Sequence, residues 1–145
     1  MAEKIAERYI VKKGGKKARV EVRSAGIRTD GDVAAAAHGI TVMKRRGYDL
    51  TSFRSSKLDK EDVRVACRIY CVSKKHQEFI SSHFTVASDT EIVTMGDDIT
   101  DPYGGTEEDY EMTAKIMERV VPGLIERDWA LIVGTDSSVS SGKRR

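Results

Sequence analysis

A run of small polar residues at the end of the chain could hold a phosphate group. Residues 134–145 read Gly-Thr-Asp-Ser-Ser-Val-Ser-Ser-Gly-Lys-Arg-Arg. Backbone N–H groups of such a loop can converge on an anion, and adjacent cations add to the attraction. Ser138 and Arg144 are separated by five residues, so a nucleophilic hydroxyl and a guanidinium could face one phosphoryl group. The alternative is an ordinary polar chain terminus.

A rigid element must position this loop. Residues 129–133 (Trp-Ala-Leu-Ile-Val) carry no charge and lie between Asp128 and Gly134. An uncharged run of this length is typical of a strand covered on both faces. We therefore expect a central strand at residues 129–133, with the polar loop at its carboxyl end.

Hydrophobic periodicity and capping residues predict the other elements. Four residues are expected to begin helices, namely Asp32, Asp59, Ser73 and, in a capping box with Asp109, Thr106. The expected helices span residues 2–12, 33–46, 59–66, 74–83 and 106–127, and the expected further strands span 18–23, 68–72 and 91–95. This alternation predicts one three-layer α/β domain over residues 1–145, with a four-stranded parallel sheet.

Composition limits the possible partners and cellular location. The chain has 25 basic and 23 acidic residues, so no strong net charge favours nucleic acid. The charged start and the lack of a long apolar run predict a cytoplasmic protein that does not enter a membrane. Cys67 and Cys71 lie four positions apart, roughly 13 Å along a strand, which favours buried thiols over a redox pair.

Four segments, in order, carry a resemblance to a known family. They are Arg23-Ser24-Ala25-Gly26, residues 47–54 (Gly-Tyr-Asp-Leu-Thr-Ser-Phe-Arg), Val72-Ser73-Lys74-Lys75-His76 and Asp101-Pro102-Tyr103-Gly104-Gly105. Together they resemble the low-molecular-weight protein tyrosine phosphatases, which include arginine phosphatases and some arsenate reductases. The resemblance covers roughly residues 1–127 and implies a flavodoxin-like topology of the sheet.

The resemblance implies a rearranged order of elements. The family begins with a central strand and a loop of the form C-x5-R-S-P-M-A-E, and Met1-Ala2-Glu3 resemble only the end of that signature. A circular permutation, with the central strand moved to residues 129–133, would account for this. The loop residues then expected to bind the substrate phosphate are Val139, Ser140, Ser141, Gly142 and Lys143.

The same resemblance implies a role for each candidate site residue. Ser138 stands at the nucleophile position, Arg144 would clamp the phosphoryl oxygens, and Asp101 would protonate the leaving group. Tyr103 would form a wall for the substrate, and Ser24 and His76 would support the loop. The plain alternatives are a turn-forming Asp101, a surface His76 and a core Tyr103.

Serine at position 138 changes what can be expected of activity. A cysteine thiol is readily ionised by neighbouring amides and cations, whereas a serine hydroxyl without a base is a poor nucleophile. Three explanations stay open: a cysteine replaced by serine, a natural binding module, or another register that aligns Val133-Gly134 with the family's Val-Cys and leaves no active centre.

We therefore expect a protein phosphotyrosine phosphatase that needs no metal or organic cofactor and acts on a phosphorylated protein, with this chain in an inactivated form. Alternatives are a protein arginine phosphatase, a non-catalytic phosphate or phosphopeptide binder, and an arsenate reductase. An arsenate reductase would need a relay of thiols, for which Cys67 and Cys71 are poorly spaced.

Overall fold

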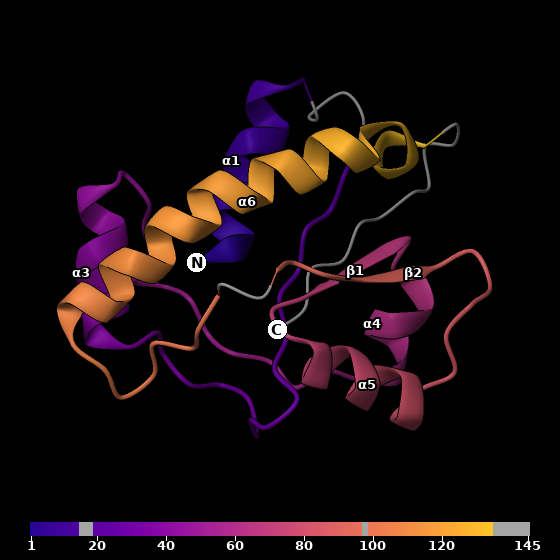
Figure 1. Cartoon of the computed structure of the whole chain (residues 1–145), viewed down its shortest axis with the longest axis horizontal. Helices are drawn as coiled ribbons and strands as arrows, with labels where there is room; N and C mark the ends of the chain where they lie inside the picture. The colour runs from indigo at the N-terminus through magenta and orange to yellow at the C-terminus, as the bar shows by residue number, and fades with distance from the viewer. Residues whose placement is uncertain (15–18, 97–98, 135–145) are drawn as a thin grey trace.

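Helices lie on both sides of a short parallel sheet, so the described chain has three layers (Figure 1). The computed structural model describes residues 1–14, 19–96 and 99–134. The elements are α1 (Ala2–Lys12), α3 (Ala37–Arg45), α4 (Lys60–Val65), β1 (Arg68–Cys71), α5 (Lys74–His83), β2 (Glu91–Thr94) and α6 (Glu107–Val133). The strands pair from Arg68 opposite Glu91 to Cys71 opposite Thr94, and α5 connects them.

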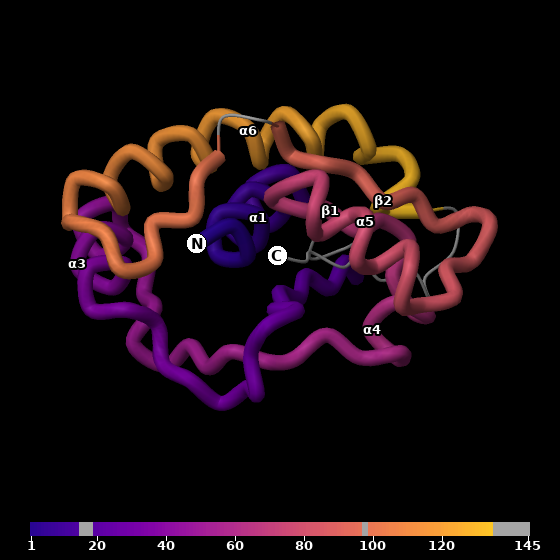
Figure 2. Tube along the Cα trace, turned by 60° about the horizontal axis from the view of Figure 1, so that its bottom comes forward, coloured from indigo at the N-terminus to yellow at the C-terminus, as the bar shows by residue number. Residues whose placement is uncertain are grey.

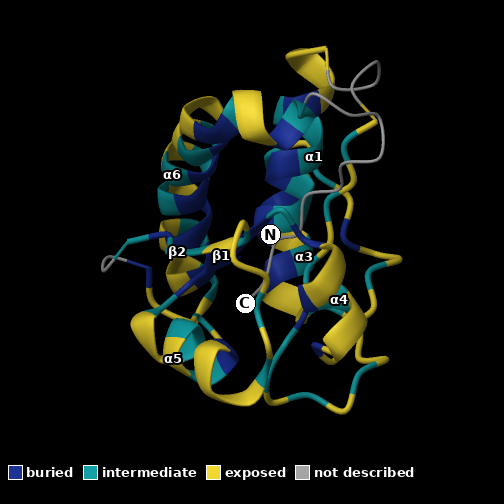
Figure 3. Cartoon of the chain, turned by 90° about the vertical axis from the view of Figure 1, so that its right-hand side faces the viewer, coloured by how far each residue is buried: buried dark blue, intermediate teal, exposed yellow. Residues whose placement is uncertain are grey.

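Strand β1 is buried on both faces, as Figure 3 shows. Ile69 and Cys71 pack into one core with residues of α4 and α5. Tyr70 and the following Val72 pack into a second core with residues of α1, α3 and α6. Side chains alternate along a strand, so four consecutive buried positions serve both cores. Burial of an aliphatic side chain such as Ile69 contributes about 1.5–3 kcal/mol.

The larger core lies where α6 crosses α1 and α3, and Figure 2 shows α6 extending from α3 towards the sheet. Its buried residues from these helices are Ala2, Ile5, Ala6, Ile10, Val42, Met43, Tyr110, Ala114, Met117, Val121, Ile125 and Ile132. Pro122 does not end α6. Within the described ranges, no helix combines the length and apolar character needed to cross a bilayer.

Three expected helix caps are confirmed. Asp59 accepts a hydrogen bond from the Asp62 N–H at 2.8 Å and begins α4. Ser73 accepts from the His76 N–H at 3.4 Å and begins α5. Thr106 and Asp109 form the capping box that begins α6. Each cap satisfies N–H groups that lack partners within the helix, so local sequence determines where these helices begin.

The central strand expected at residues 129–133 is wrong, because these residues form the last turns of α6. Ile125, Asp128 and Ile132 are buried, whereas Leu131 is 54% exposed. Spacings of three and four residues place the buried positions on one helical face, while a central strand would bury consecutive residues. The permuted order, which needed a strand at these residues, is therefore not supported.

Two other expectations differ from the structure. Asp32 does not begin a helix, since it has a φ of 58° and the helix starts after Ala36. In the segment expected as a strand, Val20 and Val22 are half-buried between more exposed neighbours, but residues 20–25 are assigned to no strand. The sheet of the described residues therefore has two strands where we expect four.

A buried polar cluster joins β1 to α6. The Tyr70 hydroxyl donates to the Asp128 carboxylate at 2.5 Å, and Arg127 donates to both Asp128 oxygens at 3.0 Å. Arg68 lies 3.7 Å from Asp128. Burial opposes ionisation of Asp128, but the hydrogen bonds from Arg127 and Tyr70 outweigh it and hold the carboxyl pKa below its usual value. Burial and Asp128 raise the pKa of Tyr70, which remains a neutral donor.

We expect Tyr70→Phe to lower the free energy of unfolding by about 1.5–3 kcal/mol at pH 7, because it removes a hydrogen bond to a charged acceptor. Urea denaturation measures this loss. The Asp128 pKa is below its usual 3.8 in the folded chain. The contribution is therefore present above about pH 4 and is lost as the pH falls through the lower folded value.

Tyr103→Phe is the matched control, since Tyr103 is 84% exposed and its hydroxyl has no hydrogen bond within the described chain. We expect it to change the free energy of unfolding by less than about 0.5 kcal/mol. An equally small effect of Tyr70→Phe at pH 7 would contradict a stabilising role of the buried hydrogen bond.

Candidate functional site

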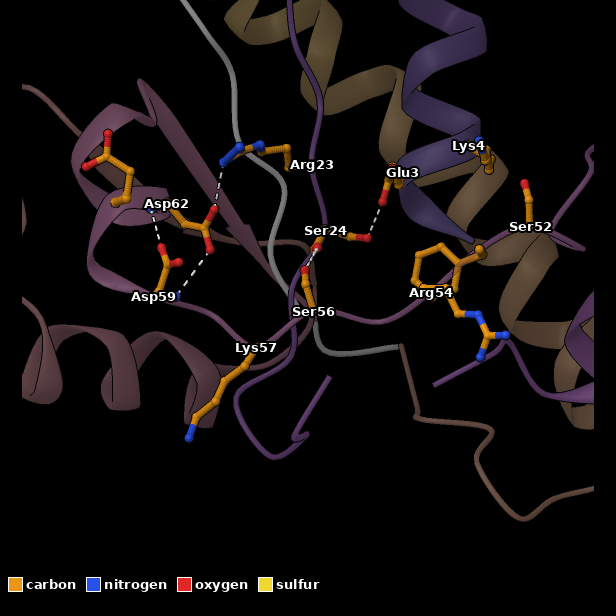
Figure 4. Close-up of a pocket in the computed structure, with 12 residues that line it drawn as sticks. Glu3, Lys4, Arg23, Ser24, Ser52, Arg54, Ser56, Lys57, Asp59 and Asp62 are labelled. Atoms are coloured by element: carbon orange, nitrogen blue, oxygen red, sulfur yellow. Dashed lines mark hydrogen bonds and ion pairs between the residues drawn. The ribbon is translucent and has the colours of Figure 1, made fainter. Parts of the chain in front are cut away.

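The segment Ser24–Thr29 borders three neighbouring cavities. The largest, of about 550 Å³, lies beside the start of α1 and the loop before α4, and Figure 4 shows the residues that line it. A second cavity of about 440 Å³ lies against the start of α5. A third, of about 210 Å³, shares residues with both. One short segment therefore links the start of α1 with the start of α5.

Ser24 is fixed at the edge of the largest cavity. Its hydroxyl donates to the Glu3 carboxylate in the first turn of α1, and its carbonyl oxygen accepts from the Ser56 hydroxyl at 3.1 Å (Figure 4). Arg23 forms an ion pair with Asp62 at 2.8 Å in the same view. These contacts hold Ser24 between α1 and the loop before α4, where we expected it to support a phosphate loop.

Asp101 and His76 line the 440 Å³ cavity together. His76 is the third residue of α5, and the Ser73 cap positions it. Asp101 comes from the loop that precedes α6, and Arg28 and Lys75 line the same cavity. Residues distant in sequence thus meet in one place, with two cations beside a carboxylate and an imidazole.

The turn that carries Asp101 is held by its own hydrogen bonds. The Asp101 carboxylate accepts from the Tyr103 N–H at 3.0 Å, and the Gly105 N–H donates to the Pro102 carbonyl at 2.8 Å. A Cβ at Gly105 would lie 2.9 Å from that carbonyl and 2.5 Å from an Asp109 oxygen, so the turn requires glycine there. Asp101 forms the turn and still leaves its carboxylate exposed at the cavity.

Tyr103 lies on the surface beside Asp101. With 84% of the residue exposed, the alternative of a core anchor is wrong. Tyr110, which we expected on the buried face of α6, is 6% exposed and lies tilted against His38 with ring centroids 5.9 Å apart. Burial raises the pKa of Tyr110, and the negative charge of Asp101 raises it further. Tyr110 is therefore a neutral, buried side chain.

The imidazole of His76 is partly removed from water. Burial lowers its pKa, the negative charge of Asp101 raises it, and the positive charge of Arg28 lowers it. Its Nδ1 atom is buried and has no hydrogen-bond partner among the described residues. The alternative interpretation of His76 as a plain surface residue is therefore wrong. Both Asp101 and Arg28 act electrostatically on its imidazole.

The structure places the predicted site residues in three groups. Asp101 and His76 share a cavity, and Ser24 lines the neighbouring one. Tyr103 lies on the surface two residues from Asp101, and the remaining predicted residues lie outside the described residues, namely Ser138, Val139, Ser140, Ser141, Gly142, Lys143 and Arg144. The described ranges contain no group of three or more His, Cys, Asp or Glu side chains that could hold a metal ion.

Sequence reasoning missed Arg28 and Lys75. The only signal was position, because Arg28 lies two residues after the Arg23–Gly26 segment and Lys75 lies within Val72–His76. With Asp101 they give the cavity a carboxyl group and two cations, and cations beside a cavity attract an anionic ligand.

Known proteins that are similar to this chain are phosphatases. A relative from Geobacillus stearothermophilus, a protein-arginine-phosphatase, is 32% identical over 114 residues, which cover 74% of this chain and 76% of the relative. The solved arginine phosphatase of G. stearothermophilus has a TM-score of 0.75 at 27% identity and covers 89% of this chain and 83% of its own.

A low molecular weight protein tyrosine phosphatase from T. tengcongensis has a TM-score of 0.75 at 26% identity, with 87% of this chain and 88% of that chain covered. The α/β architecture is therefore that of these phosphatases, which are hydrolases. The sequence model of the low molecular weight phosphotyrosine protein phosphatases matches residues 1–130. This chain accordingly belongs to the low molecular weight phosphotyrosine protein phosphatase family.

Proposed function

We propose that this protein binds phosphorylated proteins and removes their phosphate, with Asp101 as the proton donor to the leaving group. The observation that carries the proposal is the exposed Asp101 carboxylate, fixed by the Asp-Pro-Tyr-Gly-Gly turn in a cavity with His76 and two cations. A leaving oxygen or nitrogen needs a proton as its bond to phosphorus breaks. A positioned carboxylic acid supplies that proton and can then activate water.

Phosphotyrosine is the first candidate substrate. Tyr103 lies two residues from Asp101, and its ring is accessible. Aromatic rings pack favourably on one another, so a substrate phenyl ring can lie against Tyr103 while Asp101 faces its oxygen. The family to which this chain belongs is also named for phosphotyrosine.

Phosphoarginine is the second candidate. The relative that is 32% identical to this chain is a protein-arginine-phosphatase. In a phosphoarginine substrate the leaving group is a guanidinium nitrogen, to which the same carboxylic acid can deliver its proton. The two candidates differ in what Tyr103 contributes, because a guanidinium is smaller than a phenyl ring.

The proposed nucleophile, Ser138, lies outside the described residues. Ser138 and Arg144 have the spacing of a nucleophile and a phosphate clamp, but the strand expected before them is absent. A serine hydroxyl is a weaker nucleophile than a thiolate. We therefore propose slow turnover by the chain as it stands, and the alternative is a non-catalytic phosphopeptide binder.

The proposal predicts opposite effects of two substitutions on hydrolysis of p-nitrophenyl phosphate by the full chain. We expect Ser138→Cys to raise kcat, because a thiol ionises near neutral pH whereas serine does not. In that background Asp101→Asn should lower kcat by about 10²- to 10⁴-fold, the usual contribution of general acid catalysis.

Asp89→Asn is the matched control, since Asp89 is exposed on the loop before β2 and lines none of the three cavities. It should leave kcat unchanged. Equal effects of Asp89→Asn and Asp101→Asn would contradict the role of Asp101. No turnover by the cysteine form, together with retained phosphopeptide binding, would establish the binder instead.

Substitution of Tyr103 separates the two substrates. If phosphotyrosine is the substrate, Tyr103→Ala should raise KM for a phosphotyrosine peptide by about two- to tenfold, because packing of one aromatic ring on another contributes about 0.5–1.5 kcal/mol. A phosphoarginine peptide should be affected less. Steady-state kinetics with two peptides of otherwise identical sequence measure the difference, and a larger effect on phosphoarginine would contradict the phosphotyrosine assignment.

A further inference from the structure

Two exposed cations line the Asp101 cavity without an acidic partner in the described chain. Arg28 comes from the segment Ser24–Thr29 and Lys75 from the first turn of α5, and both are exposed. Among the described residues neither has a hydrogen bond or ion pair to a carboxylate. Lys75 lies at the positive end of a helix dipole, where a cation is unfavourable. The fold itself therefore gains little from either charge.

Several other arginines of the described chain hold acidic partners. Arg45 and Arg46 bind Glu107, Glu111 and Glu118 on α6, and Arg64 binds Glu61 within α4. Arg23 binds Asp62, and Arg54 lies 4.0 Å from Asp32. Arg28 lines the Asp101 cavity without such a partner among the described residues, and its positive charge lowers the pKa of His76 there.

The proposed function assigns the phosphate to the loop that carries Ser138 and Arg144. Arg28 and Lys75, which line the Asp101 cavity, are then left for a second anionic group of the substrate. The cavity of about 440 Å³ is also large enough for an amino-acid side chain. Its chemistry therefore fits the residue next to a phosphorylated residue better than the phosphate.

We propose that Arg28 and Lys75 form a subsite for an acidic side chain of the substrate, which selects phosphopeptides with Asp or Glu next to the phosphorylated residue. The subsite rests on the proposed function, because its position matters only if Asp101 faces the leaving group. It determines specificity by steering and holding the peptide and takes no part in the bond-breaking step.

The test compares two phosphotyrosine peptides, one with Glu on both sides of the phosphotyrosine and one with Ala. With the Ser138→Cys full chain, kcat/KM should favour the acidic peptide by about two- to tenfold, as expected for one or two exposed ion pairs. The preference should shrink between 50 mM and 500 mM NaCl because salt screens exposed charges. Arg28→Gln with Lys75→Gln should abolish the preference, because it lowers kcat/KM for the acidic peptide more than for the alanine peptide.

Lys74→Gln is the matched control, because Lys74 is an exposed cation on the same turn of α5 that does not line the cavity. It should preserve the preference. An equal loss for both peptides in the Arg28→Gln/Lys75→Gln protein would show that these cations hold the phosphate, and would overturn the subsite.

Direct binding separates failure of the subsite from failure of the proposed function. Fluorescence anisotropy with both peptides should show tighter binding of the acidic one. Turnover of both peptides at equal kcat/KM overturns the subsite and leaves the phosphatase standing. Absent turnover with preferential binding overturns hydrolysis but supports the subsite. Absent turnover with no binding of either peptide overturns both.

Discussion

Burial of β1 on both faces is the constraint on which the rest of the structure depends. All four side chains of β1 are buried, and this burial requires helices on both sides of the strand. Its pairing with β2 then places the ends of both strands at one edge of the sheet, where the Met95 N–H donates to the Cys71 carbonyl at 2.7 Å. The chain leaves that edge twice, into α5 and into the loop that leads to Asp101. His76 and Asp101 meet for this reason.

The two ends of β1 carry different kinds of polar group. At its amino end, Arg68 and Tyr70 contact Asp128 on α6, and Arg68 also pairs with Glu91 at 3.3 Å. These buried charges have their partners within the fold, and losing one partner would leave another uncompensated. At the carboxyl end the charged groups of the cavity are exposed and face solvent. The fold thus uses its paired charges for structure and leaves the carboxyl end available to a ligand.

Local signals in the sequence predict most helix starts, and long-range contacts account for the errors. Ser73, Asp59 and Thr106 bond to residues three positions away, so their caps can be read from the sequence. Residues 129–133 form a short apolar run that fits a strand or a buried helix end, and only packing against α1 decides between them. The family resemblance pointed to His76 and Asp101 separately, and their common cavity was not predicted. Arg28 could not be found in this way, because its neighbours in space lie far away in sequence.

Because Arg28 and Lys75 are exposed, substitutions at these positions have little effect on the stability of the fold. A buried ion pair cannot lose one member without destabilising the fold, whereas an exposed pair of cations contributes little to stability in either direction. Substitution at positions 28 and 75 is therefore open to selection on the ligand alone. Asp101 is constrained differently, because its carboxylate also accepts the Tyr103 N–H that shapes the turn. In the proposed function the proton donor Asp101 is tied to the local fold and the adjoining charges are not, so one scaffold could keep its chemistry while its preference for neighbouring residues varies.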